Sequence, residues 1–300
     1  MYIEQGYKGN IGLWKYWVLP VCFIGFIIFN YISTVNSPVS VEAMLQSMID
    51  KLGSNIVLII LLAPLAVGLF VVWGWVKLVH EQSITSLTTS RRKVDWKRIF
   101  FAFILWGSIS SGMIGVDYFL NPENYQLNFN LVPFLILSLI SIVLIPLQTS
   151  FEEYMFRGYM MQGIGLMVKN RWVPLFITSI LFGLMHLGNP EVEKLGFGIM
   201  VYYIGTGFFL GIITLMDEGL ELALGFHAAN NLFTALLVTA DWTAFQTNSV
   251  LKDVSEPVLG FDVLFPVFII FPILIFIFSK KYHWSDWRAK LFGEITVVEP

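Results

Sequence analysis

Long, uninterrupted apolar runs are the feature that most limits what this chain can fold into. The run from Leu131 to Leu147, for example, contains no charged residue. Charged residues make up only 13% of the chain, against about 25% in soluble domains. A helix of about 20 apolar residues is long enough to cross a bilayer. The sequence therefore predicts an all-α polytopic membrane protein.

Eight apolar runs, separated by polar turns, predict about eight transmembrane helices. Pro146 is expected to kink or break the fourth of them, with the helix resuming near Thr149 and running to about Gly163. A short amphipathic helix fits Val41–Leu52. The expected spans are Trp14–Thr34, Asn55–Leu78, Ile99–Leu120, a span beginning at Leu131, Val173–Leu187, Phe197–Met216, Leu220–Ala240 and Phe261–Phe278.

The order of the runs suggests three segments. Residues 1–130 would hold the first three spans and a basic loop. Residues 131–240 would form the membrane core, and residues 241–300 the last span with a basic tail. The basic stretch from His80 to Arg98 and the basic tail fall on the same side of an eight-span bundle, and the positive-inside rule makes that side cytoplasmic.

We therefore expect an integral protein of the inner or plasma membrane with both termini in the cytoplasm. Membrane lipids are expected partners, and no basic nucleic-acid surface is evident. The single cysteine, Cys22, excludes an intramolecular disulfide.

Three ionisable residues follow the fourth apolar run: Glu152, Glu153 and Arg157. Charges at membrane depth are costly and usually face a protein interior or a wet cavity. Glu153 and Arg157 are spaced i,i+4, so they lie on one helical face and are expected to form a supporting ion pair. Glu152 is turned about 100° away from Glu153 and is therefore free for chemistry.

Two of the four histidines lie inside apolar segments. His186 ends the stretch Phe-Gly-Leu-Met-His, and His227 is spaced i,i+4 from Asn231. His80 and His283 lie just outside apolar runs beside basic residues, so we expect them to be interfacial.

Helix rise places the polar residues of the core at similar depth. At 1.5 Å per residue, Glu152 lies about 16 Å and His186 about 20 Å from the polar loop that joins their helices. His227 lies about 10 Å from the start of its own helix, with Asn231 about 6 Å deeper. These side chains can therefore meet in a polar cavity inside the bundle.

This set of side chains suits hydrolysis of a peptide bond. A carboxylate and a histidine can activate water, and a second histidine with an amide can hold the oxyanion of a tetrahedral intermediate. A zinc site made of His186, His227 and Glu152 is an alternative, since two histidines and one glutamate form a known catalytic set. The chain lacks an H-E-x-x-H motif, and we expect no cofactor.

The three motifs Glu-Glu-x-x-x-Arg at 152–157, Phe-x-x-x-His at 182–186 and His-x-x-x-Asn at 227–231 resemble a known family. It contains the type II CAAX prenyl proteases and bacteriocin-processing enzymes (also called CPBP or Abi proteins), which are intramembrane glutamic endopeptidases. The resemblance covers roughly residues 131–240. It implies that Glu152, helped by His186, is the general base and that His227 and Asn231 stabilise the oxyanion.

The predicted function is therefore that of a membrane-embedded endopeptidase. Its expected substrate is a peptide or protein that reaches the membrane, with or without a lipid modification. A non-catalytic membrane scaffold or bacteriocin immunity protein is the alternative from another functional class. An unpaired carboxylate within the membrane argues against that alternative, because a scaffold has no need of one.

Overall fold

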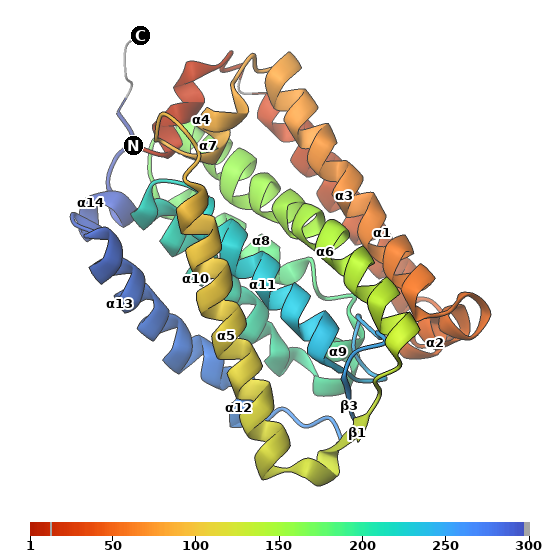
Figure 1. Cartoon of the computed structure of the whole chain (residues 1–300). Helices are drawn as coiled ribbons and strands as arrows, with labels where there is room; N and C mark the ends of the chain where they lie inside the picture. Colours follow the sequence, from red (N-terminus) through yellow and green to blue (C-terminus); the bar gives the residue numbers. More distant parts are fainter. Residues whose placement is uncertain (13, 297–300) are drawn as a thin grey trace.

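The computed structural model describes residues 1–12 and 14–296. Within these residues, helices form almost the whole fold (Figure 1). The α-helices are α1 (Lys15–Val35), α2 (Val41–Leu52), α3 (Ser54–Leu78), α4 (Ile84–Thr88), α5 (Trp96–Leu120), α6 (Leu131–Glu153), α7 (Met161–Val168), α8 (Trp172–Leu184), α9 (Pro190–Leu195), α10 (Met200–Asp217), α11 (Glu221–Leu237), α12 (Phe261–Phe265), α13 (Phe271–Tyr282) and α14 (Trp287–Phe292). The π-helical segments are Tyr154–Met160 and Pro266–Ile270, and the 3₁₀ segments are Ile3–Lys8, Pro122–Asn124 and Phe197–Ile199.

Six helical stretches in the described residues are long and apolar enough to cross a membrane, so the all-α membrane fold is confirmed and the count of eight is not. They are Lys15–Val35, Ser54–Leu78, Trp96–Leu120, Leu131–Val168, Phe197–Asp217 and Val263–Tyr282. The two other expected spans correspond to α8, with 13 residues, and α11, with 17 residues. Both are shorter than the roughly 20 residues that a full crossing needs.

The helix that begins at Leu131 is not broken at Pro146. It continues through the proline to Glu153, passes into the π-helix Tyr154–Met160 and ends with α7 at Val168. Membrane helices tolerate proline where neighbouring helices pack around them, and α6 packs against both α3 and α11. The expected break and restart near Thr149 are therefore wrong.

Helix α11 lies at the centre of the bundle. It packs against α5 on one side and α6 on another, while α6 also packs against α3, and α10 packs against α8 (Figure 1). Of the six long candidate spans, α10 is the most buried and α1 the least. The core thus surrounds the segments that carry two glutamates and two histidines, which are Glu152, Glu153, His186 and His227.

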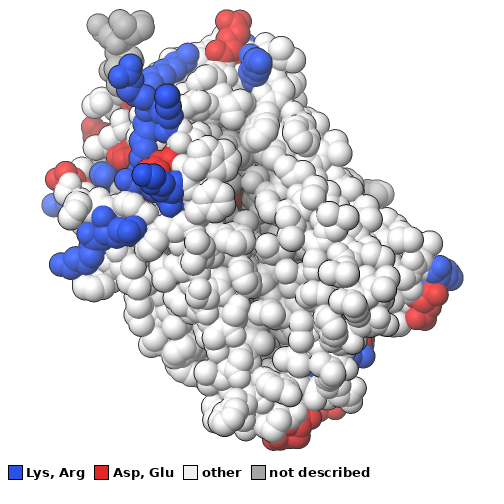
Figure 2. All heavy atoms as spheres, in the orientation of Figure 1, with Lys and Arg blue, Asp and Glu red and all other residues white. Residues whose placement is uncertain are grey.

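The outer surface is apolar over a broad middle zone. Large hydrophobic side chains such as Phe29, Phe70 and Leu139 are mostly exposed. Figure 2 shows that Lys and Arg gather at the end that carries the N-terminus and α14, with a wide uncharged zone beside them. Such a surface suits a lipid environment, and together with the six apolar helices it identifies an integral membrane protein.

A buried ion cluster holds together the charged end of the bundle. Asp217, at the end of α10, accepts from Arg91 Nη2 at 3.0 Å and forms a second ion pair with Arg98. The indole of Trp284 donates to the same carboxylate at 3.0 Å. The basic 80–98 segment is therefore fixed to α10 and to the region after α13.

A small sheet and a short helix close the opposite end (Figure 1). The strands β1 (Tyr125–Leu127), β2 (Val238–Thr239) and β3 (Leu251–Asp253) are ordered β1-β3-β2. Strand β3 is antiparallel to β1, with Tyr125 opposite Asp253, and parallel to β2, with Val238 opposite Leu251.

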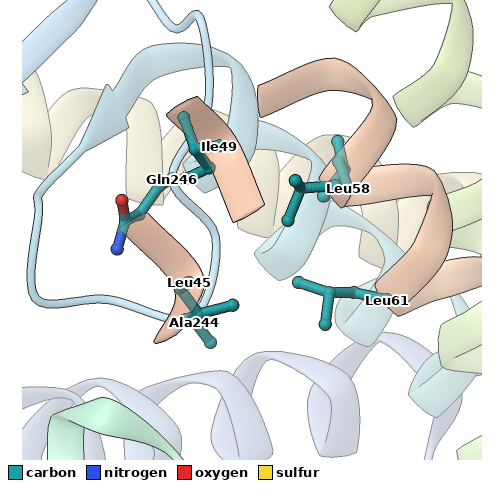
Figure 3. A pocket seen from close by; sticks show the side chains of 7 residues that line it. Leu45, Ile49, Leu58, Leu61, Ala244 and Gln246 are labelled. Atoms are coloured by element: carbon teal, nitrogen blue, oxygen red, sulfur yellow. The ribbon is translucent and has the colours of Figure 1, made fainter. Parts of the chain in front are cut away.

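The expected helix Val41–Leu52 is confirmed as α2, with the same bounds. Ser40 caps it by accepting from the backbone N–H of Ala43 at 3.2 Å. Gly53 at its end has φ +80°, a conformation that favours glycine. Figure 3 shows Leu45 and Ile49 of α2 beside Leu58 and Leu61 of α3, so an apolar face fixes α2 to the bundle.

His80 is not interfacial but buried. Its Nε2 lies 2.9 Å from the hydroxyl of Tyr159 and its Nδ1 lies 3.1 Å from the carbonyl of Asn10. Burial lowers the pKa of His80 below its ordinary value of 6.5. The N-terminal segment folds over this histidine, which the sequence pattern around His80 does not reveal.

Candidate active site

One cavity of about 540 Å³ brings together the four residues that the sequence singles out for chemistry. Glu152 reaches it from α6, His186 from just beyond the end of α8, and His227 and Asn231 from successive turns of α11. We call this space the polar cavity. The predicted meeting of these side chains inside the bundle is therefore what the fold produces, while their individual roles stay predictions.

Glu152 is buried and has a well-defined hydrogen-bond partner on its own helix. Gln148, one turn earlier, donates from Nε2 to Glu152 Oε1 at 2.5 Å. The other carboxylate oxygen, Oε2, lies 3.6 Å from His227 Nε2. A short bond from an amide to a carboxylate favours the ionised form of the acid.

Glu153 forms the predicted ion pair with Arg157. The Arg157 Nη1 lies 3.0 Å from Glu153 Oε1, and both side chains are fully buried. Arg157 also donates from Nη2 to the carbonyl of Gly207 at 3.1 Å and lies over the ring of Phe182, 4.1 Å from its centroid. The pair thus joins α6 to α10 and α8.

Arg157 lies in the π-helix Tyr154–Met160, which the sequence analysis did not predict. Short π-helical segments within α-helices are frequently found at functional sites. The wider turn follows directly after the two glutamates. No local signal, such as a glycine pair or a proline, marks it within the segment, so propensity reasoning predicted an ordinary α-helix there.

His227 lies between the two glutamates. Its Nδ1 is 2.7 Å from Glu153 Oε1, and its Nε2 faces Glu152. The resemblance pairs Glu152 with His186, but in the structure the histidine beside Glu152 is His227. The reason is packing, because α11 lies directly against α6 and brings His227 over consecutive carboxylates.

His186 is held in one orientation at another wall of the cavity. Its Nδ1 lies 2.8 Å from the carbonyl of Phe182, and its ring stacks on Tyr203 with centroids 4.3 Å apart. A carbonyl only accepts, so Nδ1 must carry the proton. In neutral His186, Nε2 therefore keeps a lone pair that can accept a proton.

Asn231 belongs to a chain of amides that the sequence analysis identified only in part. Its Nδ2 donates to Gln148 Oε1 at 3.3 Å, and its Oδ1 accepts from Asn230 Nδ2 at 3.1 Å. Asn230 in turn accepts from the indole of Trp106 at 3.1 Å. Gln148 was missed, although its position four residues before Glu152 on a helix is a signal that could have found it.

The remaining walls of the polar cavity are mixed in character. Aromatic side chains from α8, α10 and α11 form one part, and apolar residues of α3 form another. Glu191 and Asp253 add acidic groups, and the described lining contains neither lysine nor arginine. The volume is enough for several residues of an extended peptide, with apolar contact on one side and hydrogen-bonding groups on the other.

The zinc alternative finds little geometric support among the residues described. Nδ1 of His227 is engaged with Glu153, and that of His186 with a backbone carbonyl, which leaves Nε2 of each ring free, as in metal-binding histidines. Within residues 1–12 and 14–296, however, no group of three His, Cys, Asp or Glu side chains is arranged to hold a metal ion. His186, His227 and Glu152 are therefore not gathered into the expected three-ligand site.

Comparison with known sequences assigns the chain to a family. Residues 129–233 match the family described as type II CAAX prenyl endopeptidase Rce1-like. A Bacillus subtilis (strain 168) protein, "Uncharacterized protein YyaK", is 30% identical over 242 residues, which cover 77% of this chain and 80% of that protein. The chain belongs to the Rce1-like family. No solved structure matches it.

The Rce1-like match confirms the resemblance drawn from the motifs. The matched stretch contains Glu152, His186, His227 and Asn231, the four cavity residues that the motifs singled out. Membership of the family implies a CAAX-type intramembrane protease.

Proposed function

We propose that this protein is a membrane-embedded endopeptidase in which Glu152 activates a water molecule inside the polar cavity. The observation that carries the proposal is the convergence of Glu152, His186, His227 and Asn231 on one cavity. A buried carboxylate held by a single amide and facing a histidine is suited to accept a proton from water.

The reaction requires one proton acceptor and a site for a negative oxygen. The water oxygen bonds to the peptide carbonyl carbon while its proton passes to Glu152. When the carbon–nitrogen bond breaks, Glu152 returns this proton to the leaving amine. His186 assists, because the lone pair on its Nε2 can accept a hydrogen bond from the water.

Asn231 and His227 stabilise the oxyanion that forms when water attacks. Asn231 has an amide whose orientation is fixed by two hydrogen bonds. Because Nδ1 of His227 donates to Glu153, the ring nitrogen available to the cavity is Nε2, and it donates to the oxyanion in the imidazolium form, in which both nitrogens carry a proton. Donors that are held in place before reaction are typically worth 10²–10³-fold in rate each.

The substrate is a peptide or protein segment that reaches the membrane, including a lipid-modified one. No cofactor takes part. The gathering of Lys and Arg at the end that carries the N-terminus supports a cytoplasmic location for that end in a cell or plasma membrane.

A comparison of membrane peptides tests this function. Cells that carry the wild-type protein or Glu152→Gln are compared by mass spectrometry for new peptide ends. Glu193→Gln is the matched control, because Glu193 is an exposed glutamate of α9 that does not line the cavity. We expect cleavage products with the wild-type and control proteins and none with Glu152→Gln. Equal products from all three proteins would exclude the proposed role of Glu152.

A further inference from the structure

Four hydrogen bonds form a continuous chain that ends on the carboxylate of Glu152. Trp106 Nε1 donates to Asn230, Asn230 donates to Asn231, Asn231 donates to Gln148, and Gln148 donates to Glu152. The donor–acceptor distances are, in that order, 3.1, 3.1, 3.3 and 2.5 Å. This series of hydrogen bonds runs from α5 through α11 to α6.

The direction of this chain is set by its two ends. An indole N–H can only donate, and an ionised carboxylate can only accept. Each amide between Trp106 and Glu152 must therefore accept on its oxygen and donate from its nitrogen. Reversal of any one amide would place two acceptors or two donors against each other.

We propose that Gln148 is a positioning residue that couples Glu152 to Asn231, with Trp106 and Asn230 fixing the direction of the coupling. This inference rests on the proposed function, since it assigns the base and the oxyanion donor to one hydrogen-bonded unit. Bonds in such a chain polarise one another, so each donor strengthens the next. The last bond then holds the Glu152 carboxylate in one orientation and offsets part of the cost of burying its charge.

Gln148 is well placed for this role because, among the described residues, its side chain bonds to Glu152 and Asn231 alone. Its side chain is 3% exposed, and both of its amide atoms are used by Glu152 and Asn231. The other charged groups near Glu152 are His227 from α11, and Glu153 and Arg157 from its own helix and the π-helix after it. The other titratable groups that line the cavity are His186, Glu191, Tyr202, Tyr203 and Asp253. All of these groups stay unchanged when Gln148 is varied.

Substitutions of Gln148 separate positioning from packing. Gln148→Met keeps the length of the side chain and removes both hydrogen bonds. Gln148→Glu keeps an acceptor for Asn231 but replaces the donor to Glu152 with a second carboxylate. Gln162→Met is the matched control, because Gln162 is also buried and bonds to Ser86 and Gln82 away from the cavity.

The readout is the pH dependence of kcat for an internally quenched peptide built on a cleavage site found in the membrane comparison. Loss of a hydrogen bond to an ionised carboxylate should move the acid limb upward by about one pH unit in Gln148→Met. On the acid limb, well below the midpoint, kcat of Gln148→Met should be about ten-fold lower than that of the wild type at the same pH, while KM changes little. Gln148→Glu should move the limb further, because two adjacent carboxylates share a proton. Trp106→Phe should move it in the same direction by less.

An unchanged acid limb in both Gln148 variants overturns the proposal. So does an equal shift in Gln162→Met, because the effect would then be general. Infrared difference spectra of the Glu152 carboxyl band, with Glu152→Gln as the blank, give the same titration without a substrate. If no protein cleaves any peptide, the proposed function fails, and the infrared titration still decides whether Gln148 holds Glu152 ionised.

Discussion

The Nδ1 atom of His227 lies 2.7 Å from Glu153 Oε1, the same oxygen that pairs with Arg157. One carboxylate oxygen thus receives two donors, from α11 and from the π-helix, while Oε2 is buried without a hydrogen-bond partner among the described residues. Glu153 therefore orients His227 as well as neutralising Arg157. Carboxylates that fix the orientation of a histidine recur in catalytic sites.

Replacing Glu153 should damage stability first. Glu153→Gln leaves the fully buried Arg157 without its paired carboxylate, which typically costs ~3–5 kcal/mol. We expect a clearly lower melting temperature in detergent and a lower yield, with activity falling partly as a result. Glu193→Gln, the exposed control, should melt like the wild type. A Glu153→Gln protein with the melting temperature of the wild type would show that the buried Glu153–Arg157 pair does not contribute this much to stability.

The fold could be predicted from the sequence where composition alone decides it. Long apolar runs predicted most of the spans, because a segment in lipid must satisfy its backbone hydrogen bonds within a helix. The helix Val41–Leu52 was predicted from its amphipathic pattern instead. The count of eight is not confirmed at α8 and α11, which are shorter than the six long apolar helices. Helix α11 is apolar because protein surrounds most of it, whereas α8 exposes Trp172, Phe176 and Leu184. Periodicity in the sequence does not distinguish these two cases.

The sequence predicted which side chains gather at the candidate site, but not which histidine lies beside which glutamate. Helical spacing gave the Glu153–Arg157 pair and the common depth of the four cavity residues. Which histidine faces which glutamate depends on how α11 rests on α6, and spacing within one helix carries no such information. Trp106 was missed because its role depends on a contact between helices, whereas Gln148 was missed although its i,i+4 spacing from Glu152 could have found it.

The free energy of unfolding should decrease as the pH is lowered through the range in which His80 titrates. The pKa of buried His80 is lowered in the folded state, so the unfolded chain takes up the proton first. The contribution of neutral His80 is complete above about pH 6.5 and is lost as the pH falls toward its folded pKa. Melting curves of the wild type, recorded from pH 8 to 5, should therefore show a melting temperature that decreases below about pH 6.5.

His80→Gln and exposed His283→Gln form the matched pair for this measurement. The fall in melting temperature between about pH 6.5 and 5 should be smaller in His80→Gln than in the wild type. The His283→Gln protein should retain the wild-type slope. Equal slopes in all three proteins would mean that His80 does not contribute to the pH dependence.

Metal removal should leave the proposed activity intact. The described residues offer no group of three side chains arranged to hold a metal ion. We expect purified, active protein to contain well under one zinc per chain and to keep its cleavage rate after treatment with a chelator. Loss of activity that added zinc restores, together with stoichiometric zinc, would favour the metalloprotease instead.

Glu152 should behave in the opposite way to Glu153. In Glu152→Gln the new side chain keeps its shape and retains a carbonyl oxygen that can accept the bond from Gln148. Its melting temperature should therefore stay near that of the wild type. The amide cannot take a proton from water, so cleavage should fall by about 10² or more. Thermal melts and a peptide cleavage assay on the same preparations read both quantities. An unstable Glu152→Gln beside a stable but inactive Glu153→Gln would reverse the roles of the two carboxylates.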